Sequence, residues 1–315
     1  MNNCTEDDDT VQNGVVLFQL IVYIPVLSLG IPLNTIAFWI FCCKLKRWTE
    51  TRVYMINLMV ADSFLLFSLP FLLYFTKYDY PIDKLCSTIL NIYFINMPMS
   101  ILIITLIAID RYIAIKFPLK AKILRSPLKS ASICGFLWII LIIYSFLRSA
   151  FQKETEQFCL QKQSIQPNYS VLFSIIFGYL IPLGIVIFCS VQVIKCLKKK
   201  IITSPHEKKL IQKAIQIISV NLCVFVLCFS PIHITLFLRF IVDVSTACSL
   251  LLEVTTSIQI CSCIASINCC LDAFCYYFAA QEFPEFPSLF PTCISKRCRM
   301  NQSQESQPPT DQVTI

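Results

Sequence analysis

The chain has 315 residues, of which 56% are hydrophobic and only 14% are charged, and its formal net charge at pH 7 is +7. Soluble domains carry about 25% charged residues, so this composition argues against a fold in water. The scarcity of glycine argues against fibrous and low-complexity classes. We therefore expect an all-α membrane protein built from transmembrane helices.

Seven stretches with few or no charged residues are long enough to cross a membrane, which takes about 20 mostly apolar residues in a helix. In chain order they are Val15–Cys43, Val53–Thr76, Leu85–Ile109, Ser130–Leu147, Val171–Ile194, Ala214–Leu238 and Val254–Gln281. Prolines lie inside several of them, at Pro25, Pro32, Pro70, Pro98, Pro182 and Pro231. Neighbouring groups in a packed bundle satisfy the carbonyls that proline leaves free, so each stretch is predicted to be one helix.

The distribution of lysine and arginine predicts how the helices are oriented. With the N-terminus outside, most of the 26 basic residues fall on the inner side, as the positive-inside rule requires. We therefore expect an extracellular segment at 1–14, a seven-helix domain at 15–283 and a cytoplasmic tail at 284–315. The net positive charge indicates contact with inner-leaflet lipids and not with nucleic acid.

Cysteines and glycosylation sequons agree with this orientation. Four of the 18 cysteines lie in outer segments, where disulfides form, and four cysteines allow three pairings. We favour Cys86–Cys159 and Cys4–Cys248. The sequons at Asn3 and Asn168 are also outside, as glycosylation requires, whereas the sequon at Asn301 is cytoplasmic and is expected to stay unmodified.

Two carboxylates, Asp62 and Asp272, lie within the apolar stretches. An ionisable residue at this depth costs about 3 kcal/mol on insertion scales, so it needs a partner and usually has a role. Polar residues are available as partners: Asn34 in the first stretch, Asn96 and Ser100 in the third, and Asn268 one helical turn before Asp272. The set would suit Na⁺ or a shared proton; a hydrogen-bonded structural network without an ion is an equal alternative.

Six motifs occur in order on six of the seven stretches. They are NLMVAD ending at Asp62, IDRY at Ile109–Tyr112, Trp138, Pro182, Pro231 and DAFCY at Asp272–Tyr276. Together they resemble the rhodopsin-like (class A) G-protein-coupled receptor family over about residues 15–283. Within that family, Phe41–Asp62 and Asn268–Phe283 are similar to the orphan-derived receptors linked to kynurenic acid and to lysophosphatidylinositol.

The resemblance implies a G-protein switch at the cytoplasmic end of the third helix. Asp110 is expected to hold the guanidinium of the neighbouring Arg111 in the resting state, and Arg111 then contacts the G protein when the bundle opens. Tyr112, Asp272 and Tyr276 belong to the same switch. The family also has an activation relay, which falls here on Ile101, Pro182, Phe225 and Phe229.

Three positions depart from the family pattern. Ile211 stands where the resemblance leads us to expect an acid near the inner end of the sixth helix. Ser190 replaces the usual tyrosine of the fifth helix, and Ala273 replaces the proline of the seventh-helix motif. These departures concern the switching mechanism and the basal activity.

Charges at the outer helix ends indicate the class of ligand. No Asp or Glu occurs from Cys86 to Ile109, which argues against a monoamine. Cations instead gather at the outer ends, at Lys77, Arg148, Lys162 and Arg239. Arginine fits carboxylate or phosphate, so we expect an aromatic acid or a lysophospholipid head group; contact with lipid head groups is the alternative reading.

The deep part of this predicted pocket is expected to be apolar. Met97 aligns with an arginine of the kynurenic-acid receptor, so an acidic ligand with a longer apolar body would fit better than a small flat acid. His233 either lines the pocket or is a core histidine with satisfied hydrogen bonds.

The cytoplasmic segments carry sites for further partners. Lysines from Lys195 to Lys213 form a basic inner loop. Cys293 and Cys298 lie next to basic residues and are candidates for palmitoylation, although unmodified cysteines are the alternative. Phosphorylation of the polar tail would recruit arrestin, and Val313–Ile315 could bind a PDZ domain.

The first functional hypothesis is a receptor that couples to heterotrimeric G proteins, with the Gi and G12/13 classes implied by the resemblance. The alternative is a seven-helix scavenger that binds ligand without coupling. The seven stretches show no inverted repeat of the kind found in transporters. The two histidines, His206 and His233, are not spaced as metal ligands or as a nucleophile and its base. We therefore expect no enzyme, and no cofactor other than bound Na⁺.

Overall fold

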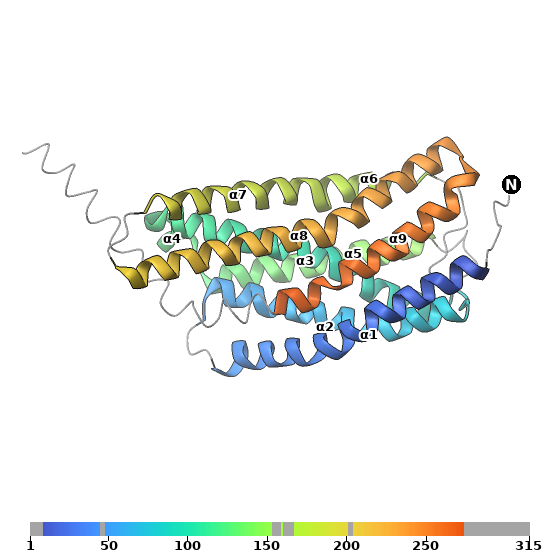
Figure 1. Cartoon of the computed structure of the whole chain (residues 1–315), viewed down its shortest axis with the longest axis horizontal. Helices are drawn as coiled ribbons and strands as arrows, with labels where there is room; N and C mark the ends of the chain where they lie inside the picture. Colours follow the sequence, from blue (N-terminus) through green and yellow to red (C-terminus); the bar gives the residue numbers. More distant parts are fainter. Residues whose placement is uncertain (1–8, 45–47, 153–158, 160–166, 201–203, 274–315) are drawn as a thin grey trace, which may run out of the picture.

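The computed structural model describes residues 9–44, 48–152, 159, 167–200 and 204–273. In this part of the chain, seven helices are long and apolar enough to cross a membrane, as the seven stretches predicted. They run side by side as an elongated bundle (Figure 1). Large apolar side chains are exposed on every one of these helices, for example Ile21, Phe136 and Leu227, and a hydrocarbon environment would cover them.

The bundle consists of the following elements in chain order. They are α1 (Asp9–Trp39) with a π-helical continuation (Ile40–Lys44), α2 (Glu50–Lys77), α3 (Lys84–Lys116), α4 (Pro118–Leu124), α5 (Pro127–Gln152), α6 (Tyr169–Ile175), a second π-helical segment (Ile176–Leu180), α7 (Ile181–Lys198), α8 (Pro205–Ser245), a short 3-10 turn (Cys248–Leu250) and α9 (Leu251–Ser266). The chain is again helical from Asn268 to Ala273.

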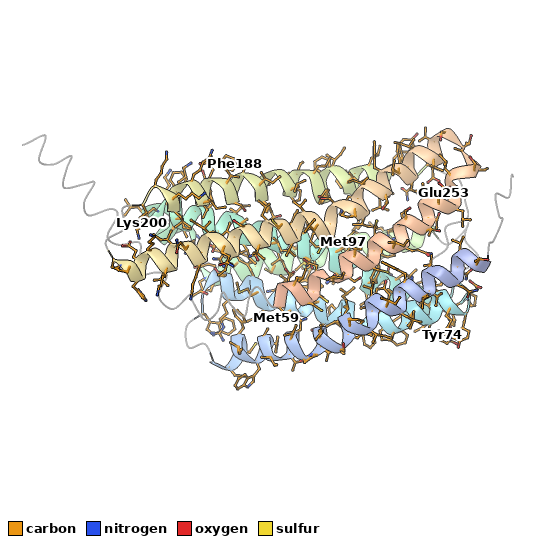
Figure 2. The ribbon with its side chains drawn as sticks, viewed as in Figure 1. Met59, Tyr74, Met97, Phe188, Lys200 and Glu253 are labelled. Atoms are coloured by element: carbon orange, nitrogen blue, oxygen red, sulfur yellow. A yellow bond between two sulfur atoms is a disulfide. The ribbon has the colours of Figure 1, made fainter. Side chains whose placement is uncertain are left out.

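The connections gather at two ends of the bundle (Figure 1). The start of α1, the link from α2 to α3 and the link from α8 to α9 lie at one end, which we call the disulfide end because it holds Cys86–Cys159. The short α4, the end of α7 and the start of α8 lie at the other, called the Asp110 end. Lys200 marks this end in Figure 2, and Tyr74 and Glu253 mark the disulfide end.

Helix α3 is the centre of the bundle. It packs against α2, α5 and α7, and its residues Met99, Ile101 and Ile103 are almost fully buried in the main hydrophobic core. An apolar helix contacted on several sides needs no polar stripe. Side chains on this helix therefore contact several of the other helices.

Helix α3 also runs farther than the sequence indicated. The uncharged stretch stops at Ile109, but the helix continues to Lys116 and carries Asp110, Arg111 and Tyr112 within it. It ends at Phe117 because Pro118 follows, and the residue before a proline is disfavoured in the α region. The triplet therefore lies between about one and two turns inside the helix end, and the charges do not stop the helix.

The fifth predicted helix is divided by a π-helical segment. Pro182 has no N–H to give to the carbonyl four residues earlier. Just before it, the N–H of Ile181 donates to the carbonyl of Ile176, five residues back. Such single π turns accommodate an irregular hydrogen-bond ladder and recur at functional sites. Here the turn includes Tyr179, which is directed into the core.

Helix α8 is the longest element, with 41 residues. At 1.5 Å per residue it spans about 60 Å, twice the thickness of a bilayer core. Ser204 caps its start by accepting a hydrogen bond from the N–H of Glu207 at 3.2 Å. Helix α8 is therefore long enough to extend beyond the hydrocarbon core of the membrane.

Candidate functional site

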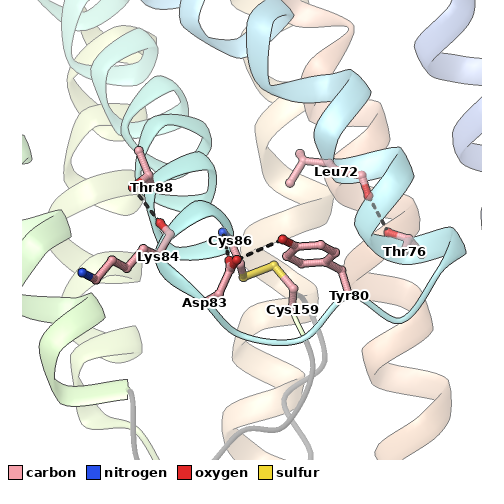
Figure 3. The surroundings of a disulfide bond; sticks show 8 residues. All are labelled: Leu72, Thr76, Tyr80, Asp83, Lys84, Cys86, Thr88 and Cys159. Atoms are coloured by element: carbon pink, nitrogen blue, oxygen red, sulfur yellow. Dashed lines mark hydrogen bonds between the residues drawn. A yellow bond between two sulfur atoms is a disulfide. The ribbon is translucent and has the colours of Figure 1, made fainter.

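The disulfide end is built around the predicted Cys86–Cys159 bond, which the structure contains (Figure 3). Asp83 caps α3 by accepting a hydrogen bond from the N–H of Cys86 at 2.7 Å, and this bond lowers the pKa of the Asp83 carboxyl. Tyr80 donates its hydroxyl to Asp83 at 2.9 Å, which raises the pKa of Tyr80. The backbone N–H of Cys159 donates to the carbonyl of Tyr80 at 2.7 Å, so the loop is fastened to the start of α3.

The second predicted disulfide is only half described. Cys248 is disulfide-bonded, but its predicted partner Cys4 lies outside the described residues, as do Asn3 and Lys162. Asn168 is described: its Oδ1 caps α6 by accepting from the N–H of Ser170 at 3.0 Å. A glycan attaches to Nδ2, so this cap and glycosylation are compatible.

The predicted ligand-binding arginines have partners that the sequence analysis did not name. Arg239 is buried, and its Nε donates to Asp243 at 3.0 Å while Nη1 donates to Thr255 of α9 at 2.6 Å. Arg148 lies over the ring of Phe94 at 3.9 Å from the ring centre. These are strong local interactions, because a charge removed from water needs a partner.

Two other predicted ligand contacts differ in their surroundings. Lys77 is exposed at the end of α2 and lies 5.3 Å from the ring centre of Tyr78. Met97 is partly buried and packs against the main core, about halfway along the bundle (Figure 2). Phe94, which carries the guanidinium of Arg148 on its ring, lies only three residues before Met97 on α3, whereas Lys77 is at the end of α2.

His233 is a core residue whose hydrogen-bonding and stacking partners are evident. Its Nδ1 donates to the carbonyl of Phe229 at 2.7 Å, and its ring stacks on Tyr179 with centres 4.1 Å apart. Tyr179 hydrogen-bonds in turn to Ser230. This arrangement favours the core interpretation of His233 over a pocket lining.

The predicted relay residues come together. Ile101, Phe225 and Phe229 are all part of the main core, and the rings of Phe225 and Phe229 meet edge to face at 5.4 Å. Pro182 is buried at the start of α7. Tyr179, which the sequence analysis missed, stacks on Phe225 and joins the relay to His233.

The predicted ion network contains oxygen atoms that lack hydrogen-bond donors. Asn96 donates to Asp62 Oδ1 at 3.3 Å, and Asn268 donates to Asp272 Oδ2 at 2.6 Å. Buried oxygens without a hydrogen-bond partner remain on Asn34, Asp62, Ser100 and Asn268. Hard cations bind such oxygens, so the donor set fits Na⁺.

At the Asp110 end, Asp110 binds a residue that is distant in sequence. Its two oxygens accept from Arg125 Nε at 2.7 Å and Nη2 at 2.9 Å, and Thr51 donates to Oδ2 at 3.2 Å. Arg125 also pairs with Glu50 at 3.1 Å. The expected pairing of Asp110 with Arg111 stays a prediction about the resting state, and the carboxylate here is engaged by Arg125.

Other parts of the predicted switch are described only in part. Tyr112 packs its ring against Phe117 and, across to α7, against Phe188. Tyr276 lies outside the described residues, as do the palmitoylation candidates Cys293 and Cys298 and the whole tail. Ile211, at the position of the expected acid, is buried in an apolar cluster.

That cluster joins α7 and α8 at the Asp110 end. Its buried members are Val193, Leu197, Ile211, Ala214 and Ile218, and Tyr112 and Ile115 of α3 pack against it. An apolar contact therefore occupies the place where the family pattern led us to expect an acid. The contact between α7 and α8 there is hydrophobic.

The sequence matches the family described as 7 transmembrane receptor (rhodopsin family) over residues 33–276. G-protein coupled receptor 35 of Mus musculus is 40% identical over 259 residues, which cover 82% of this chain and 84% of the relative. The chain belongs to the rhodopsin family of seven-transmembrane receptors.

Two further relatives place this receptor within the family. G-protein coupled receptor 55 of Mus musculus is 36% identical over 303 residues, covering 90% of this chain and 91% of the relative. Lysophosphatidic acid receptor 6 of Homo sapiens is 36% identical over 271 residues, covering 81% of this chain and 78% of the relative. The receptor is therefore a class A member of the kynurenic-acid and lysophosphatidylinositol subgroup, a multi-pass plasma-membrane protein and not an enzyme.

Several contacts of the predicted site residues were missed by sequence reasoning. Arg239 and Asp243 are four residues apart, a spacing that places both on one face of a helix, so that pair could have been found. Arg125 and Glu50 offered no comparable signal, because their contact depends on how a loop folds back on α2 and α3.

Proposed function

We propose that this receptor binds an anionic small molecule or lysophospholipid at the disulfide end and couples to heterotrimeric G proteins of the Gi and G12/13 classes at the Asp110 end. Arrestin and inner-leaflet lipids are its further partners. The observation that carries the ligand class is Arg239, an arginine with only 6% of its surface exposed, near the disulfide end of α8.

The chemistry of Arg239 and its partner supports the binding of an acidic ligand. A buried guanidinium keeps an anionic partner because the isolated charge is costly. The partner here is the carboxylate of Asp243, and a ligand carboxylate or phosphate offers the same planar, bidentate chemistry. Because Asp243 is itself buried and needs a cation, an acidic ligand would share Arg239 with Asp243.

The surroundings of Met97 support an apolar ligand body. Met97 packs on the main core, and the rings of Tyr179 and Phe225 belong to the same cluster. One relative is named a receptor for lysophosphatidic acid, which is an anionic lipid. A ligand with an acidic head near Arg239 and Arg148 and an apolar chain toward Met97 fits both observations.

The proposed orientation places the disulfide end outside the cell. Disulfides persist in an oxidising exterior, and both Cys86–Cys159 and the bonded Cys248 are at this end. The sequon residue Asn168 is exposed there. The basic residues Lys116, Lys195 and Lys200 lie toward the Asp110 end, as the positive-inside rule requires of a cytoplasmic face.

Bound Na⁺ is the proposed cofactor. Asn34, Asp62, Ser100, Asn268 and Asp272 would hold it, and the donor-free oxygens on four of them support this assignment. The ion would offset the negative charge of the carboxylates of Asp62 and Asp272 in the membrane interior. It thereby stabilises one arrangement of the helices on which it is held.

The test is a G-protein dissociation assay in cells, across Gi, Gq, Gs and G13. Wild type, Arg111→Ala, Arg239→Ala and Arg148→Ala are compared against aromatic acids and lysophosphatidic acid at equal surface expression. The matched control is Lys84→Ala, which removes an exposed cation from the same end of the bundle.

We expect a response through Gi or G13 that Arg111→Ala and Arg239→Ala abolish and Lys84→Ala retains. Loss in Arg111→Ala alone would keep the coupling and overturn the ligand site. Ligand uptake without dissociation of any G protein would support the scavenger function instead.

A further inference from the structure

The guanidinium of Arg125 connects three separate elements at the Asp110 end. It donates to both carboxylate oxygens of Asp110 on α3, at 2.7 and 2.9 Å. The same side chain pairs with Glu50 in the first turn of α2 at 3.1 Å. Arg125 itself follows the last residue of α4, where its N–H donates to the carbonyl of Ala121. We call Glu50, Asp110 and Arg125 the charge clamp.

The members of the charge clamp are shielded to different degrees. The side chain of Asp110 is 8% exposed, that of Glu50 14% and that of Arg125 28%. A pair this far from water is weakly screened, and two parallel N–H···O bonds fix its direction as well as its distance. The clamp is therefore a defined geometry, unlike a surface ion pair, whose contribution is small.

The charge clamp determines which cation the Asp110 carboxylate binds. Two of the lone-pair directions of Asp110 are used by Arg125 and another by Thr51. The neighbouring Arg111 would have to compete with a bidentate partner for the same oxygens. Arg125 thus competes with Arg111, the partner that the family resemblance implies for Asp110.

The charge clamp also sets where α4 lies. This helix has only seven residues, too few to be stable by itself in water. Leu119 and Ile123 on it are 63% and 79% exposed, and Ala121 is buried, alone among the described side chains of this helix. The ionic contacts of Arg125 to α2 and α3 therefore hold the end of α4 in position.

We infer that Arg125 is a positioning residue for G-protein coupling, which acts by holding Asp110 away from Arg111 and by fixing α4 against α2 and α3. Glu50 is its second partner and orients the guanidinium. The inference rests on the proposed coupling at the Asp110 end. Arginine is required because one ammonium cannot make the two parallel bonds to Asp110 and also reach Glu50.

The test uses purified full-length receptor in nanodiscs with heterotrimeric Gi and G13, and lysophosphatidic acid as the probe. Nucleotide exchange is measured for wild type, Arg125→Ala, Arg125→Lys and Lys129→Ala. Lys129→Ala is the matched control, because Lys129 is an exposed cation near α4 that contacts only the carbonyl of Ile123, at 3.4 Å, among the described residues. Amide hydrogen exchange of α4 and of the first turn of α2 is recorded on the same samples.

We expect Arg125→Ala to lower nucleotide exchange about tenfold, within the range of about 5- to 150-fold typical of coupling between sites. Arg125→Lys restores part of it, and Lys129→Ala leaves it unchanged. Amides of α4 exchange faster in Arg125→Ala only. In an Asp110→Asn background, Arg125→Ala has a smaller effect than in wild type, because only the contact of Arg125 with Glu50 is left to remove.

Three results would overturn the inference. They are wild-type coupling in Arg125→Ala, independent losses in the double variant, and equal α4 protection in wild type and Arg125→Ala. A wild-type receptor that activates neither G protein would count against the proposed function instead. Amide exchange would still decide, in that case, whether the charge clamp holds α4.

Discussion

Asp62 and Asp83 show how one type of side chain acts in two environments. Asp62 is 1% exposed in the middle of α2 and receives a hydrogen bond from Asn96. Asp83 is exposed and caps α3 at the disulfide end. The first carboxylate needs a cation or a proton because it is far from water, whereas the second is stabilised by the N–H groups of a helix start.

Removal of Na⁺ tests the role of Asp62. If the ion binds, thermal stability of the purified receptor falls when choline replaces sodium, by about 1.4 kcal/mol at a sodium concentration ten times Kd, or about 3 to 6 °C. Asp62→Asn keeps the shape and removes the charge, so it should melt at the same temperature in both salts. Asp83→Asn is the control and should keep the wild-type response; a sodium effect that survives in Asp62→Asn would contradict the site.

Titration tests the cap formed by Asp83. The N–H of Cys86 lowers the pKa of Asp83 in the folded receptor, so the carboxylate stabilises the fold above its unfolded pKa, about 3.9. This contribution is lost as the pH falls through the lower, folded pKa. Wild type should therefore melt higher than Asp83→Ala at pH 7, and the difference should shrink below about pH 4. A difference that is constant from pH 7 to pH 3 would show that the charge is irrelevant.

At the scale of the elements, the contact between α7 and α8 differs from the family pattern. Ile211 is 5% exposed and lies among Val193, Leu197, Ala214 and Ile218. Helices that meet through apolar side chains gain from each buried methylene. The ends of α7 and α8 therefore separate only when this hydrophobic surface is given another partner or returned to water.

Substitution of Ile211 tests this contact. Ile211→Glu places a carboxylate in the apolar cluster, where the penalty for a buried ion is several kcal/mol, on the order of 3, so the melting temperature should fall. Ile211→Leu conserves volume and should cost less than about 1.5 kcal/mol. A receptor made more stable by Ile211→Glu would indicate that the carboxylate finds a cation, and that the interface is polar.

At the scale of the whole molecule, the two ends of the bundle have distinct chemistry. The disulfide end carries Cys86–Cys159 and the sequon at Asn168. The Asp110 end carries the charge clamp and the lysines that end α3 and α7. Membrane insertion keeps such ends apart, because charged loops do not cross the bilayer after folding. The proposed orientation follows from this asymmetry.

Glycosidase treatment tests the orientation. Asn168 should carry a glycan when the receptor is expressed in human cells, and Asn168→Gln should lose one glycan-sized step in mass. Asn301→Gln is the control and should change nothing, because its sequon is expected on the cytoplasmic side. A glycan on Asn301 would reverse the proposed topology.

Much of the fold could be predicted from the sequence, because a membrane helix is a local property. An apolar stretch of sufficient length must form its backbone hydrogen bonds within itself, so Leu85–Ile109 predicted α3 without reference to any neighbour. The outer location of four cysteines left three pairings, and the favoured Cys86–Cys159 bond is confirmed. The extension of α3 to Lys116 and the π turn before Pro182 were missed, since charged helix ends and irregular turns have no hydrophobic pattern.

The sequence by itself determined that this protein spans the membrane seven times and carries the residues of a rhodopsin-like switch. Only the tertiary structure decided which residues of different elements meet: Arg125 with Asp110, Thr255 with Arg239, and the members of the apolar cluster around Ile211. Hydropathy is a sum over neighbours in the chain, whereas the strength of an ion pair depends on distance in space. Residues 15 positions apart come into contact only when the helices that carry them have packed.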